Sequence, residues 1–441
     1  MEEYLEKVLQ QIRCQKARTA IREELQAHLT DQMEANQMDG MEQEEAERAA
    51  VADMGDPVET GIALDKIHRP KVAWQMILCM TLLTAASLFF HIRMGNVATC
   101  KHIVLGFIMM LVVYHLDYTR IAQFAKPLAV LFLGSCIYAV VFGMHVAGRI
   151  WISGWPSVLG GPIQMFSYMM LYIPIYAALL YQYYGTGYKG MSKAIAWGAA
   201  ALIAAFYSAS MSLVIILYVS MLFLLMLAVA KGWFLVPKQK TMCLLGSIGG
   251  LLPLISILIF WISGRMAPYQ MERIRNWLGV GSEMNYVQEQ IKTYLSGSSF
   301  LGANAAGITG NLPDYNNSYI LTYLTASYGQ IVFLLICAIF VYLVFQIFST
   351  ALRQKNQLGM MIGCGCGMIL FLNMGINICE NLGLLPLSQT FLPFFSKGGT
   401  SILLCYILVG LLMSVYRYKD IHSVHVNRKL PRFHVHVDVE P

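Results

Sequence analysis

Long apolar runs alternate with short polar segments between residues 72 and 415, and this pattern predicts membrane-spanning helices. A helix needs about 20 apolar residues to cross the hydrocarbon core of a bilayer. The runs are Val72–Phe90, His102–Leu116, Pro127–Ala147, Pro162–Tyr181, Met242–Ile262, Tyr319–Phe348, Leu358–Ile378 and Thr400–Val415. A further run, Ala194–Ala230, is too long for one crossing and is polar at its centre, Ser208–Ser212, so it predicts two short spans. The sequence therefore predicts an all-α integral membrane protein with ten spans.

Residues 1–68 follow a different pattern, in which apolar positions recur at helical spacing within a polar sequence. One such set is Leu5, Val8, Leu9 and Ile12, and another is Ile21, Leu25 and Leu29. A third helix is expected over 44–54, before the stop signal Gly55-Asp56-Pro57, and a short fourth helix is expected to run to Lys71. We expect a small helical domain at 1–68, a membrane domain at 72–416 and a basic tail at 417–441.

Charge is divided between these parts. The whole chain is 57% hydrophobic and 13% charged, against about 25% charged in soluble domains. Residues 1–65 hold 16 of the 25 acidic residues but only 6 of the 31 Lys and Arg. The remaining basic residues mark loops between spans, so no nucleic-acid partner is expected.

The loops also predict the orientation of the chain in the membrane. The four short loops 117–126, 183–193, 231–241 and 349–357 hold 9 Lys and Arg, against 4 in the short loops of the other face. Because cytoplasmic loops carry the excess of positive charge, both termini are expected in the cytoplasm.

The other face carries one loop of about 55 residues, 264–318, with a helical stretch at Tyr286–Leu295. Loops this long are often functional. The predicted spans contain no Asp, Glu, Lys or Arg, which argues against an ion-coupled pump. Chemistry is therefore expected at the outer mouth. The carboxylates predicted there are Glu272, Glu283, Glu289, Asp314 and Glu380.

An irregular segment separates the last two spans, and membrane proteins tolerate such backbone only where it is buried in protein or lines a polar cavity. Its motifs are Asn373-Met-Gly-Ile-Asn377, Gly383-Leu-Leu-Pro386 and Leu392-Pro-Phe-Phe-Ser-Lys-Gly-Gly-Thr-Ser401. Three further motifs precede these in the same order: Gly148–Ile152, Tyr269–Ile274 and Leu312–Ile320. Together the motifs resemble those of the SEDS family (shape, elongation, division and sporulation; FtsW, RodA and SpoVE).

The resemblance implies a bacterial plasma-membrane protein of cell shape or division that polymerises undecaprenyl-linked peptidoglycan precursor at the outer face. It also implies a transpeptidase partner of the penicillin-binding class, besides membrane lipids. A divalent cation is compatible with it, although the residues themselves predict no cofactor. The substrate-binding residues that it implies are Arg149, Tyr269, Arg273, Gln290, Ser396, Gly398 and Gly399. For Arg149 and Arg273, interfacial snorkelling is an equally good explanation.

The chain departs from the family pattern where charge is expected. Ser318 stands at the position of the acid that the family needs for glycosyl transfer. Gln164 and Ser167 replace two charged residues of the fourth span, and Lys397 replaces a tyrosine. The acid expected near Ser208 is also missing.

An unactivated serine hydroxyl has too high a pKa to act as a general base. Asp314 lies four residues before Ser318, which is one turn if the segment is helical, and is the candidate base. The alternative is that Asp314 is an exposed loop residue or a helix cap.

Three functions stay open, and the sequence leaves enzyme activity undecided. The chain is a polymerase, a non-catalytic scaffold or regulator of envelope assembly, or, less well supported, a transporter of lipid-linked precursor. The pieces Glu24–Asp31, Glu45-Ala46 and Met54–Pro57 resemble the prefix domain of some bacterial permeases. This second resemblance implies that residues 1–68 dock an unknown cytosolic partner, and the alternative is a plain helical bundle.

Smaller signals complete the picture. Ten cysteines show no metal-type spacing, and Cys100 and Cys379 fall in predicted outer loops where they could pair. His434, His436 and Asp438 share one face of a possible strand, which would bind a metal weakly, but a solvated tail explains them as well. Three glycines at four-residue spacing predict that a neighbouring helix packs closely against this span: Gly359, Gly363 and Gly367.

Overall fold

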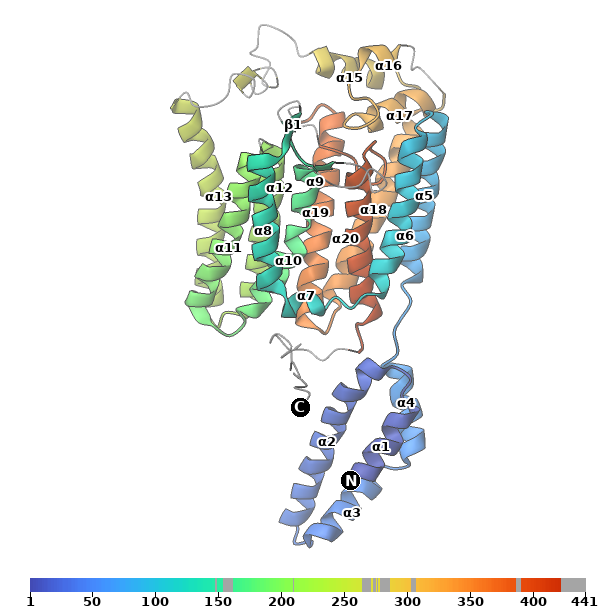
Figure 1. Ribbon diagram of the computed structural model, residues 1–441, viewed down its shortest axis with the longest axis vertical. Helices are drawn as coiled ribbons and strands as arrows, with labels where there is room; N and C mark the ends of the chain where they lie inside the picture. Colours follow the sequence, from blue (N-terminus) through green and yellow to red (C-terminus); the bar gives the residue numbers. More distant parts are fainter. Residues whose placement is uncertain are drawn as a thin grey trace, which may run out of the picture.

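The protein has a bundle of long helices and a smaller group of helices at one end of it (Figure 1). The computed structural model describes residues 1–146, 149–153, 162–208, 210–263, 271–272, 275, 277, 286–302, 307–385 and 390–421. We call helices α1–α4 the head, and the end of the bundle opposite the head the distal end.

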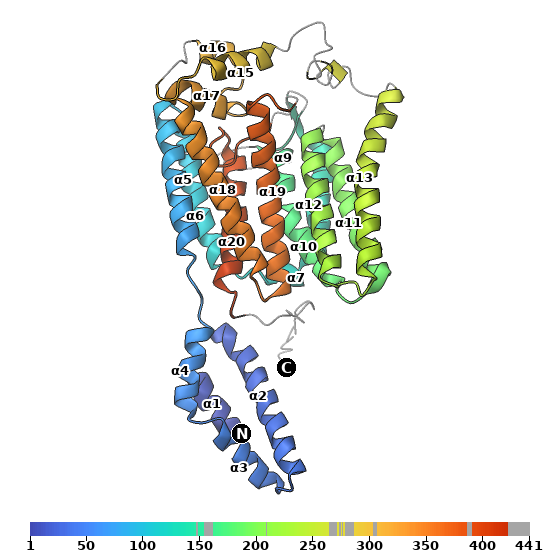
Figure 2. The same ribbon diagram turned by 180° about the vertical axis from the view of Figure 1, so that it is seen from behind.

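Eight helices in the described part of the chain are long and apolar enough to cross a membrane. They are α5 (Trp74–Arg93), α6 (Val97–His115), α8 (Ala125–Phe142), α11 (Gly187–Tyr207), α12 (Met211–Ala230), α18 (Gln330–Leu352), α19 (Gln357–Asn381) and α20 (Gly399–Arg417). Two other predicted spans correspond to α13 (Lys238–Ile262) and to the stack of α9 (Met165–Met170) on α10 (Tyr172–Gln182), which stand beside the eight (Figures 1 and 2). The chain is thus an all-α, multi-pass membrane protein, and the predicted turn between α11 and α12 is confirmed.

Helices α19 and α20 form the buried centre of the bundle. Helix α20 packs along α6, and α19 contacts α10, α12 and α18. The predicted close packing of glycines is confirmed, because a Cβ added at Gly363 would lie 2.8 Å from the Cβ of Ala351 on α18. Gly367 meets Ile347 of α18 in the same way, at 2.5 Å.

The prediction that Tyr319–Phe348 forms a single span is wrong. The run divides into α17 (Ile320–Tyr328) and α18. Gly329 between them has φ +99°, and a Cβ there would lie 2.6 Å from the carbonyl oxygen of Phe300. The main chain of residues 299–300 also accepts hydrogen bonds from the N–H groups of Gln330 (3.0 Å) and Ile331 (3.3 Å). An apolar run in the sequence does not reveal such a break, because only the glycine backbone and the crossing segment cause it.

The distal end carries short elements. A small antiparallel sheet contains β1 (Met144–Val146), β2 (Arg149–Ile152) and β3 (Ile163–Gln164). The predicted third and fourth spans are therefore too long, since the chain turns into strand before Ala147 and α9 begins only at Met165. Beyond the bundle lie α15 (Tyr286–Ser296), which confirms the predicted helix in the long loop, and α16 (Ile308–Asn311).

The head contains α1 (Glu2–Gln11), α2 (Gln15–Met38), α3 (Gln43–Asp53) and α4 (Pro57–Ile67). Helix α1 packs on α4, and α2 packs on α3. The predicted apolar positions Leu5, Val8 and Leu29 are buried, with none of their surface exposed. Helix α4 ends at Ile67, short of the expected Lys71. A short helix, α7 (Arg120–Gln123), follows α6 at this end of the bundle.

Candidate functional site

The segment 390–398 between α19 and α20 is folded into the distal end of the bundle and is anchored there by α5. The hydroxyl of Ser87 donates to the carbonyl oxygen of Phe394 at 2.6 Å. His91 Nε2 lies 2.7 Å from the carbonyl oxygen of Phe395. Because a carbonyl only accepts, this nitrogen carries the proton. Phe394 has φ +70°, a strained conformation for a bulky residue, which these two bonds hold in place.

Helix α19 presents a buried polar face to this segment. Asn377 Nδ2 donates at 3.0 Å to the carbonyl oxygens of both Ser318 and Thr390. Asn381 Nδ2 also donates to the Ser318 carbonyl, at 3.0 Å. One helix therefore ties together the two segments in which the sequence predicted site residues.

A buried carboxylate lies on the same face. Glu380 accepts hydrogen bonds from the hydroxyl of Thr390 at 2.9 Å and from its N–H at 3.3 Å, and none of its surface is exposed. The prediction that the spans hold no charged residue is therefore wrong. Helix α19 continues to Asn381, three residues beyond the predicted Ile378, because its polar face is paired inside the protein and not exposed to lipid.

Asp314 and Ser318 are in direct contact. The Ser318 hydroxyl donates to Oδ2 of Asp314 at 2.7 Å, and Asn317 Nδ2 donates to the same oxygen at 3.2 Å. Ser318 is fully buried, whereas Asp314 is exposed. Asp314 adopts φ +53°, so the segment is not helical here, and a tight turn brings the two side chains together.

The turn at 314–318 is joined to the segment 390–398. The Ser396 hydroxyl donates to the carbonyl oxygen of Asn317 at 2.7 Å. The N–H of Lys397 donates to the carbonyl oxygen of Asn316 at 2.8 Å. The side chain of Lys397 is exposed and has no salt bridge to any described residue. The carboxylate of Asp314 and the ammonium group of Lys397 thus belong to two adjoining segments, 314–318 and 390–398.

The other predicted site residues fall in different places. Gly398 caps α20 and Gly399 is its first residue, directly after Lys397. Gln290 lies on α15, a helix whose Ile291 and Tyr294 pack on the segment that leads to Ser318. Arg149 belongs to β2, and its side chain lies outside what the structure describes. Tyr269 and Arg273 lie outside the described residues altogether.

Two further expectations can be compared with the structure. Where the family pattern has charge in the fourth span, Ser167 Oγ lies 2.5 Å from Ser401 Oγ, so two hydroxyl groups pair there. The suggested disulfide is wrong, because Cys100 and Cys379 are free thiols. The histidines of the tail lie outside the described residues.

Sequence reasoning missed the polar face of α19 as part of the site. Asn377 was noted only within a motif, and Glu380 only as a loop carboxylate. The signal was present, because Asn373, Asn377, Glu380 and Asn381 recur at helical spacing. The described residues contain no group of three His, Cys, Asp or Glu that could hold a metal ion.

Comparison with known proteins identifies the family. A family model described as cell cycle protein, for FtsW, RodA and SpoVE, matches residues 71–421. This chain belongs to the FtsW/RodA/SpoVE family. The SEDS resemblance is thereby confirmed, and the match begins where the head ends.

Individual FtsW/RodA/SpoVE relatives match over shorter stretches. The chain is 34% identical over 106 residues to the probable peptidoglycan glycosyltransferase FtsW of Enterococcus hirae, covering 24% of this chain and 27% of that protein. It is 28% identical over 203 residues to that of Geobacter sp. (strain M18), covering 44% and 53%. It is 29% identical over 161 residues to stage V sporulation protein E of Bacillus subtilis (strain 168), covering 34% and 43%. The chain thus spans between 27% and 53% of these three relatives.

Solved structures share the fold. The crystal structure of Thermus thermophilus rod shape determining protein RodA superimposes with a TM-score of 0.53 at 14% identity, covering 79% of this chain and 97% of that chain. A second match is a chain from a structure that describes how a peptidoglycan synthase complex coordinates polymerization and crosslinking. It superimposes with a TM-score of 0.60 at 15% identity, covering 79% of this chain and 98% of that chain. Identity this low shows the fold alone.

Proposed function

We propose that this chain acts in bacterial cell-wall assembly and polymerises lipid-linked peptidoglycan precursor at its distal end, with Asp314 as the general base. Relatives named as probable peptidoglycan glycosyltransferases support the reaction class. The observation that carries the residue assignment is the 2.7 Å hydrogen bond from the Ser318 hydroxyl to Asp314. Through this bond, a carboxylate lies within hydrogen-bond reach of the position where the family's acid is missing.

Glycosyl transfer from a lipid diphosphate needs a base that takes the proton of the acceptor sugar hydroxyl. Oδ2 of Asp314 already accepts from Ser318 and Asn317. These bonds orient the carboxylate, and its exposure leaves the group accessible to a sugar. Asp314 would take the proton while the sugar oxygen attacks the anomeric carbon and the bond to the diphosphate breaks.

The departing diphosphate needs positive charge. Lys397 is suited to this task because its main chain is fastened to Asn316, two residues from Asp314, while its side chain is exposed. Ammonium groups form strong charge-assisted hydrogen bonds with phosphate oxygens. We assign to Lys397 the stabilisation of the leaving group, and to Gly398 and Gly399 the close approach of the substrate to the backbone.

A second function, a scaffold or regulator without turnover, has one observation in its favour. The buried polar groups at the distal end are largely satisfied by one another, as in the pairs Ser167–Ser401 and Glu380–Thr390. Such pairing stabilises a fold without needing a ligand.

The proposal includes an orientation and a partner. We propose that the head lies in the cytoplasm and the distal end outside the plasma membrane, where the polymer is needed; the excess of Lys and Arg in the loops at the head end supports this orientation. The fold shared with a chain of a peptidoglycan synthase complex supports a transpeptidase of the penicillin-binding class as partner.

The test is a polymerisation assay with purified protein in detergent and labelled lipid-linked disaccharide-pentapeptide, with and without a candidate transpeptidase. Glycan chains from the wild type that an Asp314→Ala variant does not make would support the proposal. Binding of the precursor without chains under either condition would overturn it in favour of the scaffold.

A further inference from the structure

Helix α20 connects the candidate site to the head. It begins at Gly399, directly after the segment 390–398, and ends at Arg417 beside the head (Figures 1 and 2). At 1.5 Å per residue, its 19 residues span about 28 Å. The two ends of α20 thus lie at the candidate site and near the head. Helix α5 joins the same two regions, because it follows the linker from the head and holds the segment 390–398 through Ser87 and His91.

The head contacts the bundle beside the end of α20. Lys16 Nζ, at the start of α2, lies 2.9 Å from Oδ2 of Asp117 and 4.7 Å from the ring centre of Tyr418. The other oxygen of Asp117 is fixed by the N–H and hydroxyl of Thr119, at 3.0 and 2.8 Å. The Asp117 side chain is only 9% exposed, so this ion pair is better shielded from solvent than a surface pair.

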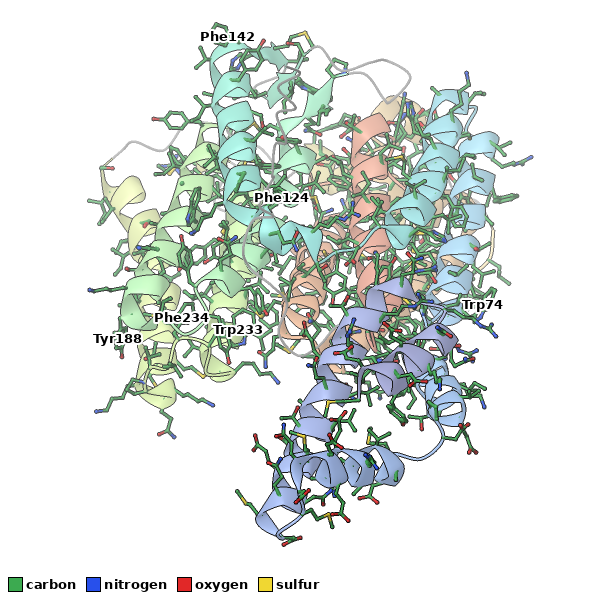
Figure 3. All side chains as sticks on the ribbon, turned by 60° about the horizontal axis from the view of Figure 1, so that its bottom comes forward. Trp74, Phe124, Phe142, Tyr188, Trp233 and Phe234 are labelled. Carbon is green, nitrogen blue, oxygen red and sulfur yellow. The ribbon has the colours of Figure 1, made fainter. Side chains whose placement is uncertain are left out.

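The linker between the head and α5 is bonded to the same end of α20. The N–H of Lys71 donates to the carbonyl oxygen of Arg417 at 3.0 Å, and Lys71 Nζ lies 2.6 Å from Oδ2 of Asp420. His68 Nδ1 lies 2.7 Å from the carbonyl oxygen of Asp420. In Figure 3, Trp74 at the start of α5 lies on the same side of the bundle as the head, whereas Trp233 and Phe234 lie on the other side. The head therefore contacts the α5, α6 and α20 side of the bundle.

Helix α20 is held in the bundle as a rigid element. A Cβ added at Gly410 would lie 2.7 Å from the carbonyl oxygen of Met110 on α6, so the two backbones are in close contact. The buried hydroxyls of Tyr406 and Thr84 lie 2.7 Å apart and fix α20 against α5. Close-packed interiors have low compressibility and transmit strain, so a displacement at one end of α20 is felt at its other end.

We propose that the head is a control element. When docked through Lys16 and Lys71, it fixes the position of α20 and thereby the segment 390–398; when a partner captures the head, that segment is loosened. Few contacts hold the head to the bundle, so the docked and released states differ by little free energy, as a switch requires. The inference concerns conformation and stands independently of the proposed reaction.

The test is amide hydrogen exchange on the full-length protein in lipid nanodiscs. The variants are Lys16→Glu, Asp117→Lys, their combination, and Lys16→Glu with Lys71→Glu. Lys7→Glu is the matched control, since the ion pair of Lys7 among the described residues is with Glu3 on the head itself. No catalytic turnover is needed, so failure of this inference and failure of the proposed function are distinguishable.

We expect exchange of peptides covering 390–402 to rise about two- to five-fold in the Lys16→Glu and Asp117→Lys variants, the range that one charge pair supports. The charge-swapped combination should return towards the wild-type rate without reaching it, because a Lys at 117 cannot accept the bonds from Thr119. The Lys7→Glu variant should exchange at the wild-type rate. The increase in exchange rate at 390–402 should be largest in the Lys16→Glu, Lys71→Glu double variant, in which both charges are reversed. Unchanged exchange at 390–402 in that double variant would overturn the inference, as would an equal rise in Lys7→Glu.

Discussion

The hydroxyl of Ser318 donates a 2.7 Å hydrogen bond to Asp314, and this contact brings a carboxylate to the position where we proposed that the family's acid is replaced. The turn that forms it has consequences for stability as well as for chemistry. Asp314 has φ +53°, a region that Asp and Asn visit more readily than other side chains.

The first prediction concerns this turn. Replacing Asp314 by Asn should change the free energy of unfolding by less than about 0.5 kcal/mol, because Asn tolerates a left-handed conformation. Replacing it by Ala should cost about 1–2 kcal/mol, since Ala tolerates that backbone poorly and loses the bonds from Ser318 and Asn317. Denaturation in mixed micelles measures both. Equal destabilisation by Asn and Ala would contradict the assignment of the turn.

The second prediction concerns the polar face of α19. Replacing Asn377 by Ala should lower the free energy of unfolding by about 2 kcal/mol, because the buried carbonyl of Thr390 loses its donor. The carbonyl of Ser318 keeps a donor in Asn381. The control is Asn96→Ala, which removes only a 3.5 Å contact with His91. Thermal unfolding in detergent compares the two, and equal midpoints would show that the Asn377 bonds contribute nothing.

The third prediction concerns the break between α17 and α18. Replacing Gly329 by Ala should cost at least about 2 kcal/mol, because its φ is +99° and the new Cβ would meet the Phe300 carbonyl at 2.6 Å. Gly246 on α13 is the matched control, since nothing lies within 4 Å of a Cβ there. Gly246→Ala should be neutral or stabilising by up to about 1 kcal/mol. A Gly329→Ala protein as stable as Gly246→Ala would contradict the tight crossing.

The fourth prediction concerns orientation. In a background with its native cysteines replaced by alanine, Lys397→Cys should react with a membrane-impermeant maleimide in intact cells. Gln37→Cys, an exposed position on α2 of the head, should react only after the cells are permeabilised. These results follow from the excess of basic residues in the loops at the head end. The reverse pattern would place the candidate site in the cytoplasm.

Much of the fold could be predicted from the sequence because apolar periodicity is a local property. Leu5, Val8 and Leu29 show this for the head, where helical spacing identified buried positions. The end of α19 could not be predicted in the same way. Glu380 and Asn381 looked like loop residues by composition, and they continue the helix only because Thr390 and Thr322 pair with them.

The site was predictable in part. The four-residue interval between Asp314 and Ser318 indicated proximity, which is confirmed, although a turn produces it. The link from Lys397 to Asn316 joins residues 81 positions apart in the sequence, and only tertiary structure reveals such a link. The roles of Arg149, Tyr269 and Arg273 stay predictions.

The most direct test of Asp314 as the general base moves the carboxylate from residue 314 to residue 318. Polymerisation of the lipid-linked precursor would be measured for the wild type, for Asp314→Asn, and for Asp314→Asn combined with Ser318→Asp, after thermal unfolding shows that all three are folded. We predict a loss of at least about 100-fold for Asp314→Asn, the contribution of a general base, and partial recovery when the acid is placed at 318. Wild-type polymerisation by folded Asp314→Asn would contradict this assignment.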